Sequence, residues 1–169
     1  MTVLVLGGAR SGKSEVAERL CRGPVTYLAT AVARDPDMAA RIARHRARRP
    51  EGWQTVEAAP EDVVAAVRKA GEPGATLLLD SLTTWVAEAP DFAVDARALC
   101  AALRERRGTS VVVSDEVGLG VHPSTEVGRR FRDRLGELNR AVADEAERVL
   151  LVVAGRVLVL EPLPDDVLL

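Results

Sequence analysis

The chain has 169 residues, of which 47% are hydrophobic and 28% are charged, and its formal net charge is −2. This length suits one domain over residues 1–169, and the apolar fraction can fill a core, which excludes general disorder. No stretch is long and apolar enough for a membrane span, and the N-terminus lacks the features of a signal peptide. The charge and the few aromatic residues argue against nucleic-acid binding. Cys21 and Cys100 lack metal-ligand spacing, so we expect buried thiols in a cytoplasmic protein.

Apolar runs alternate with helical patterns along the chain. In chain order, we expect a strand at Val3–Leu6, a helix at Ser14–Arg22, a strand at Val25–Ala29, a charged helix at Asp37–Arg48, a strand at Trp53–Val56, a helix at Pro60–Ala70, a strand at Ala75–Leu79, a helix at Val94–Arg107, a strand at Thr109–Val113, a long helix capped by Ser124 and running to about Glu147, and strands at Val149–Ala154 and Val157–Leu160. This alternation implies crossovers and a largely parallel sheet. Too few residues join the last two strands for a crossover, so we expect them to form an antiparallel hairpin.

A glycine-rich motif lies between the first strand and the first helix. It matches G-x-x-x-x-G-K-[ST] in full and consists of Gly7, Gly8, Ala9, Arg10, Ser11, Gly12, Lys13 and Ser14. In this context the backbone N–H groups converge on phosphate oxygens, and the helix N-terminus adds positive potential. Lys13 is expected to reach the β- and γ-phosphates, and the Ser14 hydroxyl to bind Mg²⁺. The motif therefore predicts a P-loop nucleotide site.

Two strand ends offer an acid for the metal ion and its water. Asp80 ends the TLLLD strand, while Asp115 and Glu116 follow VVVS. Either strand end could supply the metal-binding acid; we favour Asp80. Asp115-Glu116 leads into a glycine-containing loop, which suits a second substrate or a switch.

The predicted helix 37–48 is rich in arginine and contains one of the two histidines. Met38, Ile42 and His45 share one face of this helix, and Arg41 and Arg49 lie four residues on either side of His45. Nearby positive charge keeps an imidazole neutral and nucleophilic, as covalent nucleotidyl transfer needs. A solvated charged face is the alternative interpretation. The other histidine, His122, we expect to lie in a loop without a catalytic role.

Five blocks of the sequence resemble one enzyme family. They are GGARSGKSEVAE (7–18), YLATA (27–31), DMAARIARHRARRPEGWQTVE (37–57), LLLDSLTTW (77–85), and the stretch from DEVGLG to VVAG (115–155). Together they are similar to the bifunctional adenosylcobinamide kinase/adenosylcobinamide-phosphate guanylyltransferases of cobalamin biosynthesis. The P-loop is shared by many enzymes, whereas the blocks around His45 and after Asp115 are far more specific.

The resemblance implies two reactions. A nucleoside triphosphate, ATP or GTP, phosphorylates adenosylcobinamide, and GTP then gives GMP to a histidine, matched here by His45, which passes it to adenosylcobinamide phosphate. It also implies a RecA-like P-loop NTPase fold with one antiparallel strand, and a trimer. Besides the P-loop, the residues that we expect to contact nucleotide are Thr30, Ala31, Arg46, Arg48, Arg49, Glu57 and Asp80.

The sequence departs from the family at two places. Asp115 stands where the family often has Asn, which makes metal binding there harder to dismiss, and the stretch Val86–Val94 is short, which affects the expected corrinoid contacts. Two alternatives stay open at this point. One is a small-molecule P-loop kinase or RecA-like ATPase without the guanylyl step, and the other is a nonenzymatic nucleotide-dependent binding module.

Overall fold

A computed structural model describes residues 1–31, 40, 43, 46–47, 49–71 and 73–164. At its centre is a seven-stranded sheet with the order β3-β2-β4-β5-β1-β6-β7. The strands are β1 (Thr2–Gly7), β2 (Val25–Ala29), β3 (Gln54–Glu57), β4 (Thr76–Asp80), β5 (Ser110–Asp115), β6 (Arg148–Val153) and β7 (Arg156–Leu160). All neighbouring pairs are parallel except β6–β7, which is an antiparallel hairpin. The predicted fold class, a mostly parallel sheet flanked by helices with an antiparallel last strand, is confirmed.

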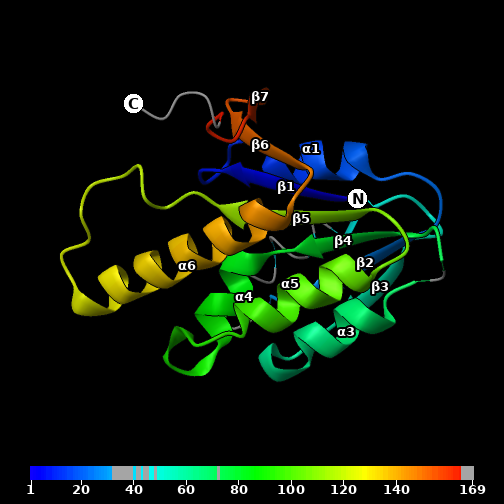
Figure 1. Ribbon diagram of the computed structural model, residues 1–169, viewed down its shortest axis with the longest axis horizontal. Coiled ribbons are helices and arrows are strands. Elements are labelled where there is room, and N and C mark those ends of the chain that lie inside the picture. The colour runs from blue at the N-terminus through cyan, green and yellow to red at the C-terminus, as the bar shows by residue number, and fades with distance from the viewer. Residues whose placement is uncertain (32–39, 41–42, 44–45, 48, 72, 165–169) are drawn as a thin grey trace.

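Helices cover both faces of this sheet (Figure 1). The described α-helices are α1 (Lys13–Leu20), α3 (Val63–Lys69), α4 (Leu82–Glu88), α5 (Ala96–Glu105) and α6 (Glu126–Glu145), with single 3₁₀ turns at η1 (Pro60–Asp62) and η2 (Pro90–Phe92). Helix α1 packs on one face, and α3 to α6 pack on the other. No described helix is both long and apolar enough to cross a membrane.

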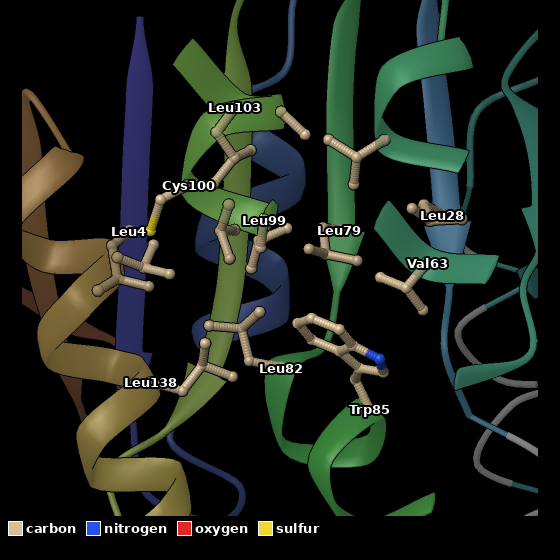
Figure 2. Packing of buried hydrophobic residues seen from close by; sticks show 14 of the residues in the cluster. Leu4, Leu28, Val63, Leu79, Leu82, Trp85, Leu99, Cys100, Leu103 and Leu138 are labelled. Atoms are coloured by element: carbon tan, nitrogen blue, oxygen red, sulfur yellow. The ribbon is translucent and has the colours of Figure 1, made fainter. Parts of the chain in front are cut away.

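The core divides into two layers because successive side chains of a strand point to opposite faces. Leu4, Leu28 and Leu79 pack with Leu82, Trp85 and other side chains of α3 to α6 (Figure 2), whereas the alternate strand residues pack against α1. The buried indole Nε1 of Trp85 donates to the carbonyl oxygen of Pro60 at 2.8 Å. Both cysteines are free and buried, as expected from the sequence.

Three helix predictions need correction. Helix α4 was not expected; it begins with a capping box, in which the Ser81 hydroxyl accepts from the Thr84 N–H. The cap of α6 is Thr125 rather than Ser124, because the Thr125 hydroxyl is the one that accepts from the Gly128 N–H. The predicted Pro60–Ala70 helix divides into η1 and α3. Of the predicted 37–48 helix, residues 40, 43, 46 and 47 are helical, and the others lie outside the described residues.

The topology brings the candidate acids to one edge of the sheet. Strands β1, β5 and β4 are adjacent and parallel, and their carboxyl ends are Gly7, Asp115 and Asp80. In open parallel sheets, ligands bind at this edge.

Candidate nucleotide-binding site

The P-loop connects the end of β1 to the first turn of α1. Gly12 has a φ of 93°, a left-handed conformation that glycine adopts without strain. Inside the loop, the Ser11 N–H donates to the Gly8 carbonyl at 3.2 Å. From the β6–β7 turn, the Gly155 N–H donates to the Ser11 carbonyl at 2.8 Å. The C-terminal hairpin therefore supports the loop directly, a contact that sequence spacing gave no means to predict.

Gly7 is required for steric reasons. A Cβ at this position would lie 2.7 Å from the Val152 carbonyl oxygen and 2.5 Å from the Ser11 Oγ. A Cβ at Gly8 would meet nothing within 4 Å. The first glycine of the motif thus lets the loop pass close to β6.

Lys13 lies in the loop with its charge compensated by an acid. Its ammonium nitrogen is 2.5 Å from Asp115 Oδ1 and donates to the Gly8 carbonyl at 3.2 Å. Only 6% of the lysine side chain and 20% of the aspartate side chain are exposed. Asp115 therefore faces the P-loop from the neighbouring strand, while Asp80 lies one strand farther away.

Two side chains that the sequence analysis did not single out hold the backbone of Asp115. The Thr83 hydroxyl accepts from the Asp115 N–H at 2.8 Å, and the Asn139 amide donates to the Asp115 carbonyl at 3.0 Å. Thr83 comes from α4 and Asn139 from α6. Thr83 lies in the LLLDSLTTW block and Asn139 in the last block, so the blocks contain both residues, but only the fold gives their role.

Asp80 has a different partner, Tyr27 in the middle of β2. The Tyr27 hydroxyl donates to Asp80 Oδ2 at 2.6 Å. Burial raises the pKa of Tyr27 well above its usual range, and the adjacent Asp80 charge adds to the effect. The phenol therefore stays protonated and remains the donor in this pair.

Arg46 and Arg49 contact side chains of β3. Arg46 forms an exposed ion pair with Glu57 at 2.9 Å, so these two candidate nucleotide ligands contact each other. Arg49 donates to the Thr55 hydroxyl at 3.0 Å, and its guanidinium carbon lies 3.4 Å from the centre of the Tyr27 ring. This stacking is a cation–π contact.

The remaining predicted contacts are less closely grouped. Thr30 is buried, and its hydroxyl donates to the Ser81 carbonyl at 2.7 Å, which links the end of β2 to the start of α4. Ala31 follows it and is partly exposed. His45 and Arg48 lie outside the described residues, as do Arg41 and Arg44. His122 is exposed, and its Nδ1 lies 2.9 Å from a guanidinium nitrogen of Arg132.

The donors present suit a magnesium ion that is shared with a nucleotide. Ser14 lies in the first turn of α1 and is partly exposed, and carboxylates end β4 and β5. Within the described ranges, no three His, Cys, Asp or Glu side chains form a group that could hold a metal ion alone. Magnesium commonly binds one or two carboxylates and completes its shell with phosphates and water, so this sparse set fits it.

Comparison with known proteins points to one enzyme family. The family model described as cobinamide kinase / cobinamide phosphate guanyltransferase matches residues 3–160. The bifunctional adenosylcobalamin biosynthesis protein CobP of Pseudomonas aeruginosa is 44% identical over 92% of this chain and 94% of its own length. The bifunctional adenosylcobalamin biosynthesis protein CobU of Escherichia coli K12 is 37% identical over 92% of this chain and 97% of its own length.

One solved structure supports the fold alone. A Pyrococcus horikoshii protein, described as project PH0250, aligns with a TM-score of 0.58 and 7% identity over 98% of this chain and 88% of its own. The family match and the relatives carry the assignment, and this chain belongs to the cobinamide kinase / cobinamide phosphate guanyltransferase family.

Proposed function

We propose that this chain phosphorylates adenosylcobinamide and then converts the product to adenosylcobinamide-GDP. The observation that carries the proposal is the family match over residues 3–160, within which the complete P-loop joins a buried strand to a helix. A membership that covers nearly the whole chain favours both activities over a plain kinase or a binding module.

In the first reaction, a hydroxyl oxygen of adenosylcobinamide attacks the γ-phosphorus of ATP or GTP, and the hydroxyl proton passes to water. The bond from that phosphorus to the β–γ bridging oxygen breaks, and a nucleoside diphosphate leaves. Lys13 and the N–H groups of residues 8–14 stabilise the negative charge that develops on the phosphate oxygens. To do so, Lys13 must turn from Asp115 toward the phosphates.

In the second reaction, His45 is the proposed nucleophile. Its imidazole nitrogen attacks the α-phosphorus of GTP, so that a P–N bond forms and pyrophosphate leaves. A phosphate oxygen of adenosylcobinamide phosphate then attacks the same phosphorus, breaks the P–N bond and restores the histidine. Arg46, Arg48, Arg49, Glu57, Thr30 and Ala31 are the further nucleotide contacts that we propose for this chain.

Mg²⁺ is the proposed cofactor, with Ser14 and Asp80 as its protein ligands. When bound, the ion neutralises phosphate charge and orients the triphosphate. Asp115 is the competing candidate, because it lies next to Lys13. The Mg²⁺ requirements of Asp80→Asn and Asp115→Asn distinguish the two acids.

We also propose that the chain is cytoplasmic and assembles as a trimer. The trimer is an expectation from the family resemblance, and the surface of β7 supports an assembly. Every residue of β7 is exposed, including Val157, Leu158, Val159 and Leu160. An apolar strand at a sheet edge invites pairing or packing with another chain. Sedimentation equilibrium should give three times the chain mass of 18.1 kDa, and a mass of one chain would contradict the trimer.

The decisive experiment uses GTP labelled at the α-phosphate. The protein with Mg²⁺ should acquire a covalent label that maps to His45, and adenosylcobinamide phosphate should discharge it as adenosylcobinamide-GDP. Kinase turnover without a covalent label would support a plain small-molecule kinase. Absence of both reactions would contradict the proposal.

A further inference from the structure

We propose that Tyr27 is a positioning residue that sets the orientation of the Asp80 carboxylate. The inference rests on the proposed function in one respect, namely that Asp80 holds the metal ion or its water. It adds a residue that acts through Asp80 without contacting phosphate or substrate.

The hydrogen bond between these residues is short and shielded from solvent. Tyr27 is only 3% exposed, and its hydroxyl lies 2.6 Å from Asp80 Oδ2. Hydrogen bonds to a charged acceptor are roughly twice as strong as those between neutral groups. Because β2 and β4 pair in parallel and Ala29 lies opposite Asp80, Tyr27 reaches Asp80 along the sheet from two residues earlier. The bond therefore restricts rotation of the Asp80 carboxylate.

The ring that carries this hydroxyl is itself fixed. One side packs in the layer that also contains Val25, Val113 and Trp53. The Arg49 guanidinium lies over the ring face at 3.4 Å, and its Nη1 donates to Thr55 at 3.0 Å. Within the described part of the chain, the buried Nε of Arg49 has no hydrogen-bond partner, while the guanidinium carbon lies over the Tyr27 ring. A fixed ring places its hydroxyl at one point, which is what orienting a carboxylate requires.

A purely structural role for Tyr27 makes a different prediction. In that case the hydroxyl would contribute to folding as any buried hydrogen bond does, with no effect on metal binding. Thr76 offers a matched control, because its buried hydroxyl donates to the Arg22 carbonyl at 2.8 Å at the opposite end of the same β2–β4 pair. Thr76→Val removes that bond far from the P-loop edge.

The kinetic test compares Tyr27→Phe, Thr76→Val, Asp80→Asn and the double variant Tyr27→Phe/Asp80→Asn. Tyr27→Phe keeps the ring under Arg49 and removes only the hydroxyl. It should raise the Mg²⁺ concentration for half-maximal turnover by about tenfold and lower kcat, with little change in KM for the triphosphate. Thr76→Val should lower the melting temperature without moving the Mg²⁺ requirement. Tyr27→Phe should add little to the effect of Asp80→Asn, since both act through one carboxylate.

A second readout does not depend on turnover. Tyr27 is the chain's single tyrosine, so protein labelled with ¹³C at the tyrosine ζ carbon gives one phenol resonance. Adding Mg²⁺ with GDP should shift this resonance in the wild-type protein, and the shift should be lost in Asp80→Asn. If the phenol resonance of Asp80→Asn has the same chemical shift as that of the wild type, the proposed hydrogen bond is contradicted.

The two proposals fail in different ways. Wild-type protein that forms no adenosylcobinamide-GDP contradicts the proposed function. If the wild type is active but Tyr27→Phe leaves the Mg²⁺ requirement unchanged, the role of Tyr27 is overturned and the function stays intact. The same holds if the effect of Tyr27→Phe is as large in the Asp80→Asn background as in the wild type. An active wild type in which Asp80→Asn has no effect also overturns it.

Discussion

The ammonium nitrogen of Lys13 lies 2.5 Å from Oδ1 of Asp115, on the strand next to the P-loop strand. The pair is mostly buried, so screening by water and salt is weak. A phosphate group that is to contact Lys13 must compete with this carboxylate. The affinity of the loop for phosphate therefore depends on both Lys13 and Asp115.

Lys13→Ala should abolish both half-reactions, because we propose that one phosphate cradle serves both triphosphates. Removal of a preorganised positive group from a phosphoryl-transfer site is expected to lower kcat by about 10²–10³-fold. The measurements are the rate of adenosylcobinamide phosphorylation and the yield of protein-bound GMP. Near-normal guanylylation in this variant would show that a second nucleotide site exists.

Asp115→Asn should strengthen binding of GDP measured without Mg²⁺, by roughly threefold to tenfold. The amide no longer competes with phosphate for Lys13, while the Thr83 and Asn139 contacts to the backbone of residue 115 remain. Titration calorimetry gives the affinity. Asp80→Asn is the comparison, since it should instead raise the Mg²⁺ requirement of both steps by removing a charge from the metal shell. If Asp115→Asn raises that requirement and Asp80→Asn does not, Asp115 is the metal ligand.

His45→Asn should separate the two activities. Direct phosphoryl transfer needs no covalent protein intermediate, so kinase turnover should survive, whereas the guanylyl adduct and adenosylcobinamide-GDP should vanish. The wild-type adduct should be labile in acid and fairly stable in alkali, as expected of a P–N bond, and peptide mapping identifies the residue. Formation of adenosylcobinamide-GDP at the wild-type rate by this variant would exclude the covalent mechanism.

Gly7→Ala should destabilise the protein far more than Gly8→Ala. The added methyl group at position 7 would lie 2.7 Å from the backbone carbonyl oxygen of Val152, which cannot move without disturbing β6. Overpacking of this kind costs about 1–3 kcal/mol. Urea unfolding measures the difference, and Gly8→Ala is the matched control because nothing lies within 4 Å of its Cβ. Equal stability of the two variants would mean that the loop has room that the structure does not show.

Stability should fall in alkali partly through Cys21. Burial raises the pKa of this thiol to about 12, above its ordinary value of 9.0. The folded protein therefore keeps a proton that the unfolded chain loses, so this contribution is complete below pH 9 and is lost as pH rises toward 12. Cys21→Ser keeps a donor for the Ala17 carbonyl and should flatten the decline in unfolding free energy between about pH 8 and about pH 10.5. An unchanged decline would contradict the shift.

The sequence predicted the strands well because each buried strand is a short apolar run with clear boundaries. Helix α4 was missed because it has only seven residues, and its capping box at Ser81 and Thr84 directly follows the strand. The site was predicted unevenly for a different reason. The P-loop is local, whereas the proximity of Lys13 and Asp115 depends on strand order, which spacing along the chain does not give. The contacts of Asn139 and Gly155 depend on it in the same way.

The position of β1 inside the sheet, between β5 and β6, affects how the protein is made. Val3 pairs with Val111 on one side and with Arg148 on the other, so β1 is synthesised long before both of its partners. While the ribosome completes the chain, this apolar strand lacks both of its native neighbours, so we expect slow folding and exposure of the strand to aggregation. Gly155, whose N–H donates to the Ser11 carbonyl, is synthesised later still. The P-loop is therefore synthesised well before the segment that supports it.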